Sequence, residues 1–556
     1  MGRHHDGVIS RALPRAAVMA MAAVPLVFVA IFFFLPLLGM LGRGFIDESG
    51  SVDLSGIPEV LLRSRTLRVL VFTVAIAAGG TALTVLLGLP VAYVLYRLRF
   101  PGRTAARAVI VMPFVMPTVV VGVMFRSLLA PSGPAGFLGW DGHWVSILLA
   151  FVFFNLAVVV RIVGSTWAGM DNRAEHAAAA LGARPGRVWR TVTLPALLPA
   201  IISAATLVFL FCSTAFGVVL TLGGLRYGTI ETEIYFLTTQ FFDLRAAAVL
   251  SILQVLFVLV LLQVAAAARA GSEQSLRVGT RAASAPGRGD IAMLALAAVV
   301  LGFVLLPVLT LVLGSFRDQG QWTLRYYSLL AEPANSRGRR VSVTEAIGNS
   351  VSTALDATVI AVLLGMLVAL VVTRAPRRVA ERRLLRGVDA LFMLPLGVSA
   401  VTIGFGFLIT LDRPPLDLRS SPILVPIAQA MVALPLVVRT LTPALGGVDP
   451  RLRQAAAALG AGPFRAAWTV DRPVVVRPLI AATGFAFAVS LGEFGATSFL
   501  VRPERPTVPV MIYDLLGSPG PDNAGMALAA SVVLAVLTTT ALALVERLRP
   551  DGQRSL

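Results

Sequence analysis

The sequence contains no lysine, one cysteine and four histidines among 556 residues. The single cysteine, Cys212, excludes an intrachain disulfide framework and a cysteine-based metal site. The histidines are terminal (His4, His5) or isolated (His143, His176), and so predict no metal site. A phosphate-binding P-loop needs a lysine at the β/γ-phosphates. We therefore expect no nucleotide pocket, no cofactor and no catalytic residues in this chain.

Charged residues are also scarce, at 14% of the chain against 57% hydrophobic residues. Soluble domains carry about 25% charged residues, so most of this surface cannot face water. All 47 basic residues are arginine and the net charge is +18, but the arginines lie between long apolar runs rather than in one patch. This pattern is typical of membrane topology. We expect a lipid bilayer as partner and no nucleic acid.

Long apolar runs are abundant, and a helix needs about 20 apolar residues to cross about 30 Å of hydrocarbon. Twelve runs qualify, in two sets of six. The first set lies at 17–41, 67–96, 108–130, 144–167, 196–222 and 246–268. The second lies at 291–316, 347–373, 387–411, 422–442, 478–500 and 524–546. The first run exceeds the core of a signal peptide, about 7–15 residues, so we expect a retained helix.

The distribution of arginine orients these helices. With the amino terminus in the cytoplasm, the cytoplasmic segments collect most of the arginines and the outer segments are slightly acidic, as the positive-inside rule expects. The outer loop 317–346 is an exception, because Arg337, Arg339 and Arg340 cluster there. Long loops weigh less in that rule. Both termini are therefore predicted to be cytoplasmic.

The two sets of helices are predicted to be parallel repeats, because six helices return the chain to its starting side. We expect a flexible Gly/Ser/Ala/Arg-rich linker between them. The predicted organisation is a tail at 1–16, a first repeat at 17–269, the linker at 270–290, a second repeat at 291–547 and a tail at 548–556.

Internal repetition supports this division. Residues 176–182 read HAAAALG and residues 454–460 read QAAAALG, an offset of 278. The same offset aligns further residues of the two halves: Asp171 with Asp449, Ala183 with Ala461, Pro185 with Pro463, Arg187 with Arg465, Pro195 with Pro473, Arg161 with Arg439, and Phe216-Gly217 with Phe494-Gly495. Nearby offsets align Gly88 with Gly365, Pro113 with Pro395 and Gly122 with Gly404. The whole six-helix unit is duplicated.

Both copies of this motif fall in the predicted cytoplasmic loop between the fourth and fifth helix of their repeat. We name residues 171–195 and 449–473 the alanine-rich segments. Four alanines and a leucine favour a short helix, which an aspartate can cap and a glycine in the left-handed conformation can end. An alanine-rich connector without a partner would have the same composition. Because the helix occurs twice in equivalent loops, we favour docking in a groove of another protein.

The pattern of alanines, a glycine and a downstream Leu-Pro resembles the EAA loop of ATP-binding-cassette importer permeases. The resemblance covers nearly the whole chain and implies a fused double permease of the type I importer kind in a bacterial inner membrane. Residues 194–195 give the Leu-Pro, whereas the second half has Arg472-Pro473, and His176 and Gln454 occupy the position of the motif's glutamate. In that family the loop docks into the ATPase subunit. The resemblance therefore implies the following docking residues: Asp171, Glu175, His176, Ala177, Ala178, Leu181, Gly182 and Pro195, with Asp449, Gln454, Ala455, Ala456, Leu459, Gly460 and Pro473.

Three further stretches narrow the branch of this family. AFGVVLTLGG (215–224) and TIETEIY (229–235) are similar to the first half of thiamine permeases. SLGEFGATSFL (490–500) is similar to a segment shared by iron, thiamine, molybdate and sulfate permeases. The resemblance favours thiamine as cargo, with ferric iron or another inorganic ion as the alternative.

One acid predicted at membrane depth is a candidate for the translocation path. Glu493 lies midway along the eleventh run between Gly492 and Gly495. An ionisable group at this depth costs at least ~2.5 kcal/mol on insertion scales. Its carboxylate can line a path for a cationic cargo, or it can accept a structural hydrogen bond between helices. With Gly217, the repeat counterpart of Gly495, these residues form the candidate translocation path.

The expected function is import by alternating access between the two halves. Two copies of a cytoplasmic ATPase subunit would bind ATP and Mg²⁺, and an extracytoplasmic solute-binding protein would deliver the cargo. The rival is a twelve-helix proton-coupled secondary transporter, which also contains parallel repeats. Such a protein would place coupling carboxylates in its helices and would need no docking loops.

Overall fold

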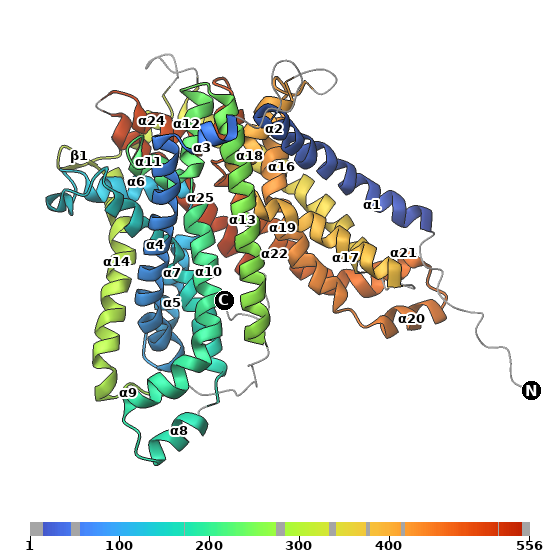
Figure 1. Ribbon diagram of the computed structural model, residues 1–556, viewed down its shortest axis with the longest axis horizontal. Helices are drawn as coiled ribbons and strands as arrows, with labels where there is room; N and C mark the ends of the chain where they lie inside the picture. Colours follow the sequence, from blue (N-terminus) through green and yellow to red (C-terminus); the bar gives the residue numbers. More distant parts are fainter. Residues whose placement is uncertain are drawn as a thin grey trace, which may run out of the picture. The chain divides into compact units, whose positions relative to one another are not determined.

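The computed structural model describes residues 15–45, 56–171, 173–273, 284–332, 341–373, 379–412, 417–520 and 522–547. Residues 1–14 and 548–556 of the predicted tails, residues 274–283 of the predicted linker, and Arg337, Arg339 and Arg340 lie outside the described residues. The described chain is built of helices and one two-stranded hairpin (Figure 1).

The first repeat forms helices at all six predicted runs. Its elements, in chain order, are α1 (Arg15–Val29), η1 (Ala30–Phe34), α2 (Leu35–Phe45), α3 (Gly56–Leu61), α4 (Ser64–Arg97), α5 (Arg103–Val115), α6 (Thr118–Leu129), η2 (Gly136–Leu138), α7 (Trp144–Gly169), α8 (Arg173–Ala180), α9 (Pro185–Val188), η3 (Trp189–Thr193), α10 (Leu194–Ser213), α11 (Gly217–Gly223), α12 (Ile230–Thr239) and α13 (Leu244–Glu273).

The second repeat follows the same plan, with a hairpin in its first outer loop. Its elements are η4 (Arg288–Asp290), α14 (Ile291–Ser315), β1 (Arg317–Asp318), β2 (Gln321–Trp322), α15 (Arg325–Leu330), α16 (Val343–Val372), α17 (Val379–Met393), η6 (Leu394–Gly397), α18 (Ala400–Thr410), α19 (Leu424–Gly446), α20 (Pro450–Ala458), α21 (Pro463–Ala466), η7 (Ala467–Asp471), α22 (Arg472–Leu491), α23 (Thr497–Leu500), α24 (Val508–Gly517) and α25 (Asn523–Arg547).

Several of the predicted membrane segments are broken helices rather than continuous ones. Among the described residues, ten helices are long and apolar enough to cross a membrane, and α5 with α6 forms an eleventh segment bent by 108°. The run 387–411 is divided into α17, η6 and the apolar α18. The fold is therefore the predicted all-α, two-repeat membrane fold, and its third and fifth segments are interrupted in both repeats.

The chain contacts divide the molecule into two compact units that do not follow the two repeats. Unit 1 comprises Met1–Met40, Ile347–Thr507 and Leu537–Leu556, and unit 2 comprises Leu41–Ala346 and Val508–Val536. Unit 2 therefore contains α14, the first long helix of the second repeat. Unit 1 contains α1 and η1, from the start of the first repeat. The first helix of each repeat therefore belongs to the unit that is formed mainly by the other repeat.

Unit 2 is organised around α4 and α7, which pack closely because α4 carries a glycine at their contact. A Cβ atom at Gly88 would lie 2.7 Å from Cγ1 of Val159. Helices α10 and α14 pack against α4 as well. The last residues of the predicted linker also belong here, since Arg99 N donates to Ser284 O at 2.8 Å and Tyr93 Oη donates to Asp290 Oδ1 at 2.7 Å. This part of the linker is attached to the end of α4.

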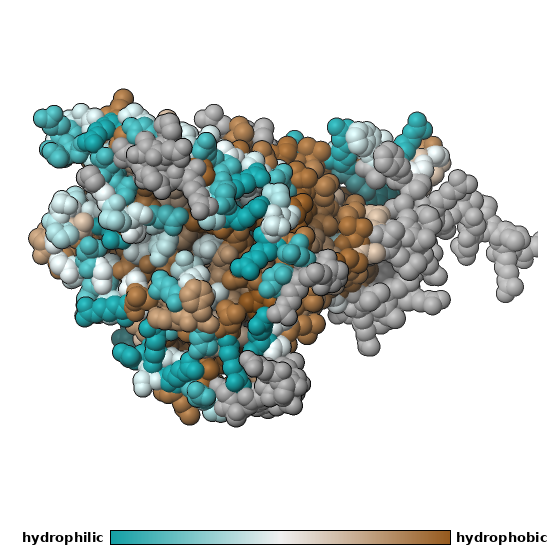
Figure 2. All heavy atoms as spheres, turned by 90° about the horizontal axis from the view of Figure 1, so that it is seen from above, coloured by the Kyte–Doolittle hydropathy of each residue, from teal (hydrophilic) through white to brown (hydrophobic). Residues whose placement is uncertain are grey.

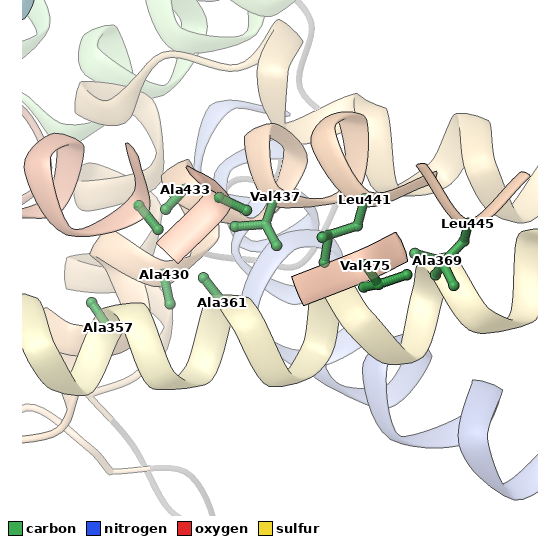
Figure 3. Packing of buried hydrophobic residues seen from close by; sticks show 11 residues of the cluster. Ala357, Ala361, Ala369, Ala430, Ala433, Val437, Leu441, Leu445 and Val475 are labelled. Carbon is green, nitrogen blue, oxygen red and sulfur yellow. The ribbon is translucent and has the colours of Figure 1, made fainter. Parts of the chain in front are cut away.

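Unit 1 repeats that packing with α16, α19 and α22. Small side chains of α16 face those of α19, which lets the two helices approach closely (Figure 3). A Cβ atom at Gly365 would lie 2.6 Å from Cγ1 of Val437. These two residues are the repeat counterparts of Gly88 and Val159, so one glycine–valine contact is used in both units.

The outer faces of the long helices are hydrophobic. Large exposed side chains on these helices include Val71, Leu86, Val299, Val359 and Leu363. Brown, hydrophobic atoms also gather in the middle of the face drawn in Figure 2, with hydrophilic, teal atoms more frequent on the left. A soluble monomer rarely exposes contiguous apolar patches larger than a few hundred Å². These faces are suited to contact with lipid.

Candidate functional site

The first alanine-rich segment forms a short helix with a defined beginning and end. Asp171 Oδ1 accepts a hydrogen bond from the backbone N–H of Arg173 at 2.9 Å and so caps α8. Gly182 has a φ of +81°. The N–H of Gly182 bonds to Ala179 O and the N–H of Ala183 bonds to Ala178 O, which is a Schellman ending. The predicted cap and glycine stop are confirmed.

The second alanine-rich segment repeats this geometry. Asp449 Oδ1 accepts from the N–H of Arg451 at 2.9 Å, and Gly460 has a φ of +81°. The N–H of Ala461 bonds to Ala456 O at 2.9 Å and closes the same ending on α20. Because both ends are fixed by local bonds, α8 and α20 hold one conformation without help from their exposed faces. Figure 1 shows each of them beyond the ends of the long helices of its own unit.

One face of each short helix is open and ends in a leucine. Leu181 and Leu459 occupy equivalent positions, and each is 89% exposed. His176 and Ala177 in α8, like Gln454 and Ala455 in α20, are also exposed. An exposed leucine beside small side chains is suited to insertion into an apolar groove.

The opposite face of α8 is fixed to the rest of unit 2 by a buried ion pair. Arg97 Nη2 lies 2.7 Å from Glu175 Oε2, and their side chains are 9% and 14% exposed. The second carboxylate oxygen, Glu175 Oε1, accepts from Thr193 Oγ1 at 2.9 Å. Glu175 therefore connects α8 to the end of α4 and to the residue that precedes α10.

The inward face of α20 makes the equivalent connection with the charges reversed. Arg453 Nε donates to Asp471 Oδ1 at 2.8 Å. The offset of 278 aligns Arg453 with Glu175 and Asp471 with Thr193. Sequence reasoning missed Arg97, Thr193 and Asp471, although a polar residue at the same two positions of both repeats was a signal that could have found the contact.

A widened turn leads from each short helix into the next long helix. The π-helical turns η3 and η7 end at Thr193 and Asp471. Pro195 and Pro473 then stand in the first turn of α10 and α22. A proline lacks the N–H that would close an ordinary helical bond to the preceding turn, and a π-turn accommodates such an interruption. The inward contact in each copy thus sits directly before the membrane helix.

The structure places Glu493 in a break between helices and not midway along one. α22 ends at Leu491, Gly492 follows as its C-cap, and α23 begins at Thr497. The carboxylate of Glu493 is buried and accepts hydrogen bonds from the N–H groups of Ala496 (2.8 Å) and Thr497 (3.0 Å) and from Thr497 Oγ1. It therefore satisfies the first donors of α23, a role for which an anion is well suited.

The glycines of the candidate path lie where broken helices meet. Gly217 begins α11 and is buried, and a Cβ atom at Gly495 would lie 2.9 Å from Cβ of Ala400. A Cβ atom at Gly404 of α18 would lie 2.8 Å from Cα of Ala496. Its counterpart Gly122 of α6 faces Thr221 of α11 in the same way, at 2.6 Å. The interrupted third and fifth segments of each repeat therefore pack on one another.

Three acids in α12 (Ile230–Thr239) and in the turn after it are held by arginines or other side chains. Glu231 and Glu233 are buried, and Glu233 forms two hydrogen bonds with Arg65, at 2.6 and 2.9 Å. Arg63 Nη1 donates to Asp243 Oδ2 at 2.8 Å. Burial alone would raise the pKa of Asp243, but the hydrogen bonds from Arg63 and the Ala246 N–H bring it below its usual value. These contacts fix α12 and the turn after it, and the three acids are not free for a ligand.

Comparison with known proteins gives two matches to one family along the chain. The family described as "Binding-protein-dependent transport system inner membrane component" matches residues 84–278 and 361–551. The two matches, one in each predicted repeat, together cover more than half of the sequence.

Individual relatives are similar over different lengths. A probable ABC transporter permease protein (y4fN) of Sinorhizobium fredii is 27% identical over 543 residues, 93% of this chain and 94% of its own. The thiamine transport system permease protein ThiP of Brucella abortus is 29% identical over 485 residues, 84% of this chain and 86% of its own. The molybdenum transport system permease protein ModB of Mycobacterium bovis is 40% identical over 200 residues, 34% of this chain and 73% of its own.

Proposed function

The chain belongs to the family of binding-protein-dependent transport system inner membrane components, and from this premise we propose that a separate ATPase drives it through α8 and α20. It is a multi-pass inner-membrane transport subunit. Two copies of a cytoplasmic ATP-binding-cassette subunit bind ATP and Mg²⁺ and dock on the two short helices. In this proposal both chain termini are cytoplasmic.

One observation carries the proposal: two equivalent helices present the same open face. Each is capped by an aspartate, ended by a glycine at φ +81° and tipped by a leucine that is 89% exposed. A single exposed leucine is ordinary, but here the same exposed leucine recurs on equivalent helices of both repeats. Two equivalent docking helices suit two copies of one ATPase subunit.

In the proposed cycle, ATP-driven closure of the ATPase pair draws α8 and α20 together and opens the pathway outward. A soluble binding protein then releases the solute between the two repeats. Hydrolysis separates the ATPase subunits and returns the pathway to its inward-facing state. The driving free energy comes from the ATPase because this chain contains no lysine for a P-loop.

Thiamine is the proposed cargo. The support is the similarity to the thiamine permease of Brucella abortus, which extends over 84% of this chain. The similarity to the molybdenum permease is confined to 34% of it.

Reconstituted uptake tests the proposal. The chain, its ATPase and its binding protein in proteoliposomes should accumulate labelled thiamine when ATP is supplied to the ATPase side, and should not when ATP is omitted. Unlabelled ferric iron and molybdate should fail to compete. Uptake driven by a proton gradient without the ATPase would contradict the mechanism. Competition by molybdate would contradict thiamine as the cargo.

A further inference from the structure

We propose that the inward-facing contacts of α8 and α20 are positioning contacts that transmit the movement of each short helix to the membrane helix after it. The proposal rests on the proposed function, because it concerns how movement imposed by an ATPase reaches the membrane. The positioning residues are Glu175 with Arg97 and Thr193, and Arg453 with Asp471. Position 175 is acidic whereas the equivalent position 453 is basic, so the two side chains cannot replace one another.

Each short helix touches its own unit through very little surface. α8 has eight residues, and only Glu175 and Ala178 are partly buried; in α20 the equivalent residues Arg453 and Ala456 are partly buried. A helix this short is not stable by itself in water. A push on the open face can therefore reach the following helix through the chain backbone and through the polar side chain of Glu175 or Arg453.

The side-chain contact is needed because the backbone route has a bend in it. Gly182 and Gly460 turn the chain at φ +81°, and a π-turn follows in both copies. Glu175 bridges this bend directly, since its carboxylate meets Thr193 at the end of the π-turn. Arg453 does the same by bonding to Asp471, the last residue of η7. With the bridge in place, the short helix and the start of the long helix move as one body.

The two bridges have opposite polarity and different strength. Glu175 is an acceptor held by a buried arginine, and removing one partner of a buried pair is strongly destabilising. Arg453 is a donor whose side chain is 34% exposed, so its pair is weaker. An arginine at position 175 would face Arg97, and a glutamate at position 453 would face Asp471. Exchange of the side chains at positions 175 and 453 alone would therefore place like charges together in both copies.

The second copy gives the sharper experiment, because its pair is partly exposed and its loss is less damaging to folding. Arg453→Asp and Asp471→Arg are made singly and together in the full chain, assembled with its ATPase and binding protein. Three quantities are measured: ATPase bound per chain, ATP hydrolysed, and solute taken up. We expect each single variant to keep the ATPase and its hydrolysis but to lower solute uptake per ATP about fivefold, as loss of about 1 kcal/mol implies. The double variant should restore uptake per ATP.

Arg288→Asp is the charge-matched control, since Arg288 is exposed and lies outside both short helices. It should leave uptake per ATP unchanged. In the first copy, Thr193→Val removes one hydroxyl and should lower uptake per ATP without unfolding the buried Arg97–Glu175 pair.

Several results would overturn the inference while leaving the proposed function intact. Single variants with normal uptake per ATP, or a double variant that is no better than the singles, would show that the contact does not transmit movement. Single variants that lose the ATPase would assign the contact to docking. The proposed function fails separately, if the unaltered chain binds no ATPase or takes up solute without ATP.

Discussion

At the scale of single residues, the hydrogen bonds of Glu493 favour one of the two roles open to a carboxylate at membrane depth. Its oxygens accept bonds from the N–H groups of Ala496 and Thr497 and from the Thr497 hydroxyl. A carboxylate satisfied in this way has little remaining capacity for a passing cation. It holds α23 against α18, where Gly404 contacts Ala496 and the broken third and fifth segments pack on one another. Glu493 is therefore expected to support the pathway rather than to bind the cargo.

Replacing Glu493 with glutamine tests this role. The amide keeps one acceptor oxygen, but its NH₂ group would face backbone N–H donors, so a buried donor loses its partner at a cost of about 1–3 kcal/mol. We expect Glu493→Gln to lower the thermal unfolding temperature and to reduce thiamine uptake along with it. Unfolding in detergent and uptake of thiamine are the measurements.

The control for that substitution is Glu59→Gln, because the side chain of Glu59 is 75% exposed and its surface ion pair contributes little. It should change neither measurement. Normal thermal stability of Glu493→Gln combined with a loss of thiamine uptake would instead assign Glu493 to the path.

At the scale of elements, α8 and α20 are too short to be stable alone, and capping and tertiary contacts stabilise them. Eight or nine residues do not make a helix by propensity alone, and both helices leave most of their side chains exposed. Local bonds at the two ends and one inward contact hold them. What remains available to a partner is the open face that ends in Leu181 or Leu459.

We expect the double variant Leu181→Asp, Leu459→Asp to lose the ATPase. A charge in the apolar groove that receives each leucine would be desolvated without a partner. Co-purification of the ATPase with the tagged chain should fall at least tenfold, and ATP-driven uptake should fall with it. Either single variant should retain part of the ATPase, because the other docking helix is intact.

Leu225→Asp is the matched control for the leucine substitutions. Leu225 is 56% exposed, on the predicted outer side after Gly224. ATPase retention should be unaffected by this variant. Full retention of the ATPase by the double variant would remove α8 and α20 from the docking surface.

At the scale of the whole molecule, the two compact units draw on both repeats. Unit 2 needs α14 from the second repeat, since α14 packs along α4 and α6. Unit 1 needs η1 from the first, where Phe32 contacts Phe407 with ring centroids 6.0 Å apart. A single repeat therefore cannot complete the packing of either unit.

This interleaving predicts how the chain behaves when it is cut in the linker. Residues 1–278 produced alone should be degraded readily, because the face of α4 that α14 covers is open. The longer fragment 1–332, which contains α14, should resist proteolysis better. Residues 1–278 produced together with residues 279–556 should co-purify as a complex. Equal protease resistance of the two amino-terminal fragments would show that α14 is not needed for this packing.

Much of the architecture could be predicted from the sequence because the deciding forces are local or periodic. Runs of about 20 apolar residues locate membrane helices without knowledge of their neighbours. Asp171 and Gly182 act on N–H and C=O groups within a few residues, so their roles as cap and stop could also be predicted. The repeat offset then placed the same features at Asp449 and Gly460.

The remaining features depend on residues that are far apart in sequence and were decided only by the tertiary structure. Arg97 and Glu175 are 78 positions apart, and nothing local indicates that they pair. The breaks at Gly492 and before Gly217 arise because helices must bend to pack on α18 and α6, which apolar composition alone does not reveal. The exchange of first helices between the units is likewise a property of packing. Hydrophobicity determined which segments enter the membrane, and side-chain fit between distant helices decided how they assemble there.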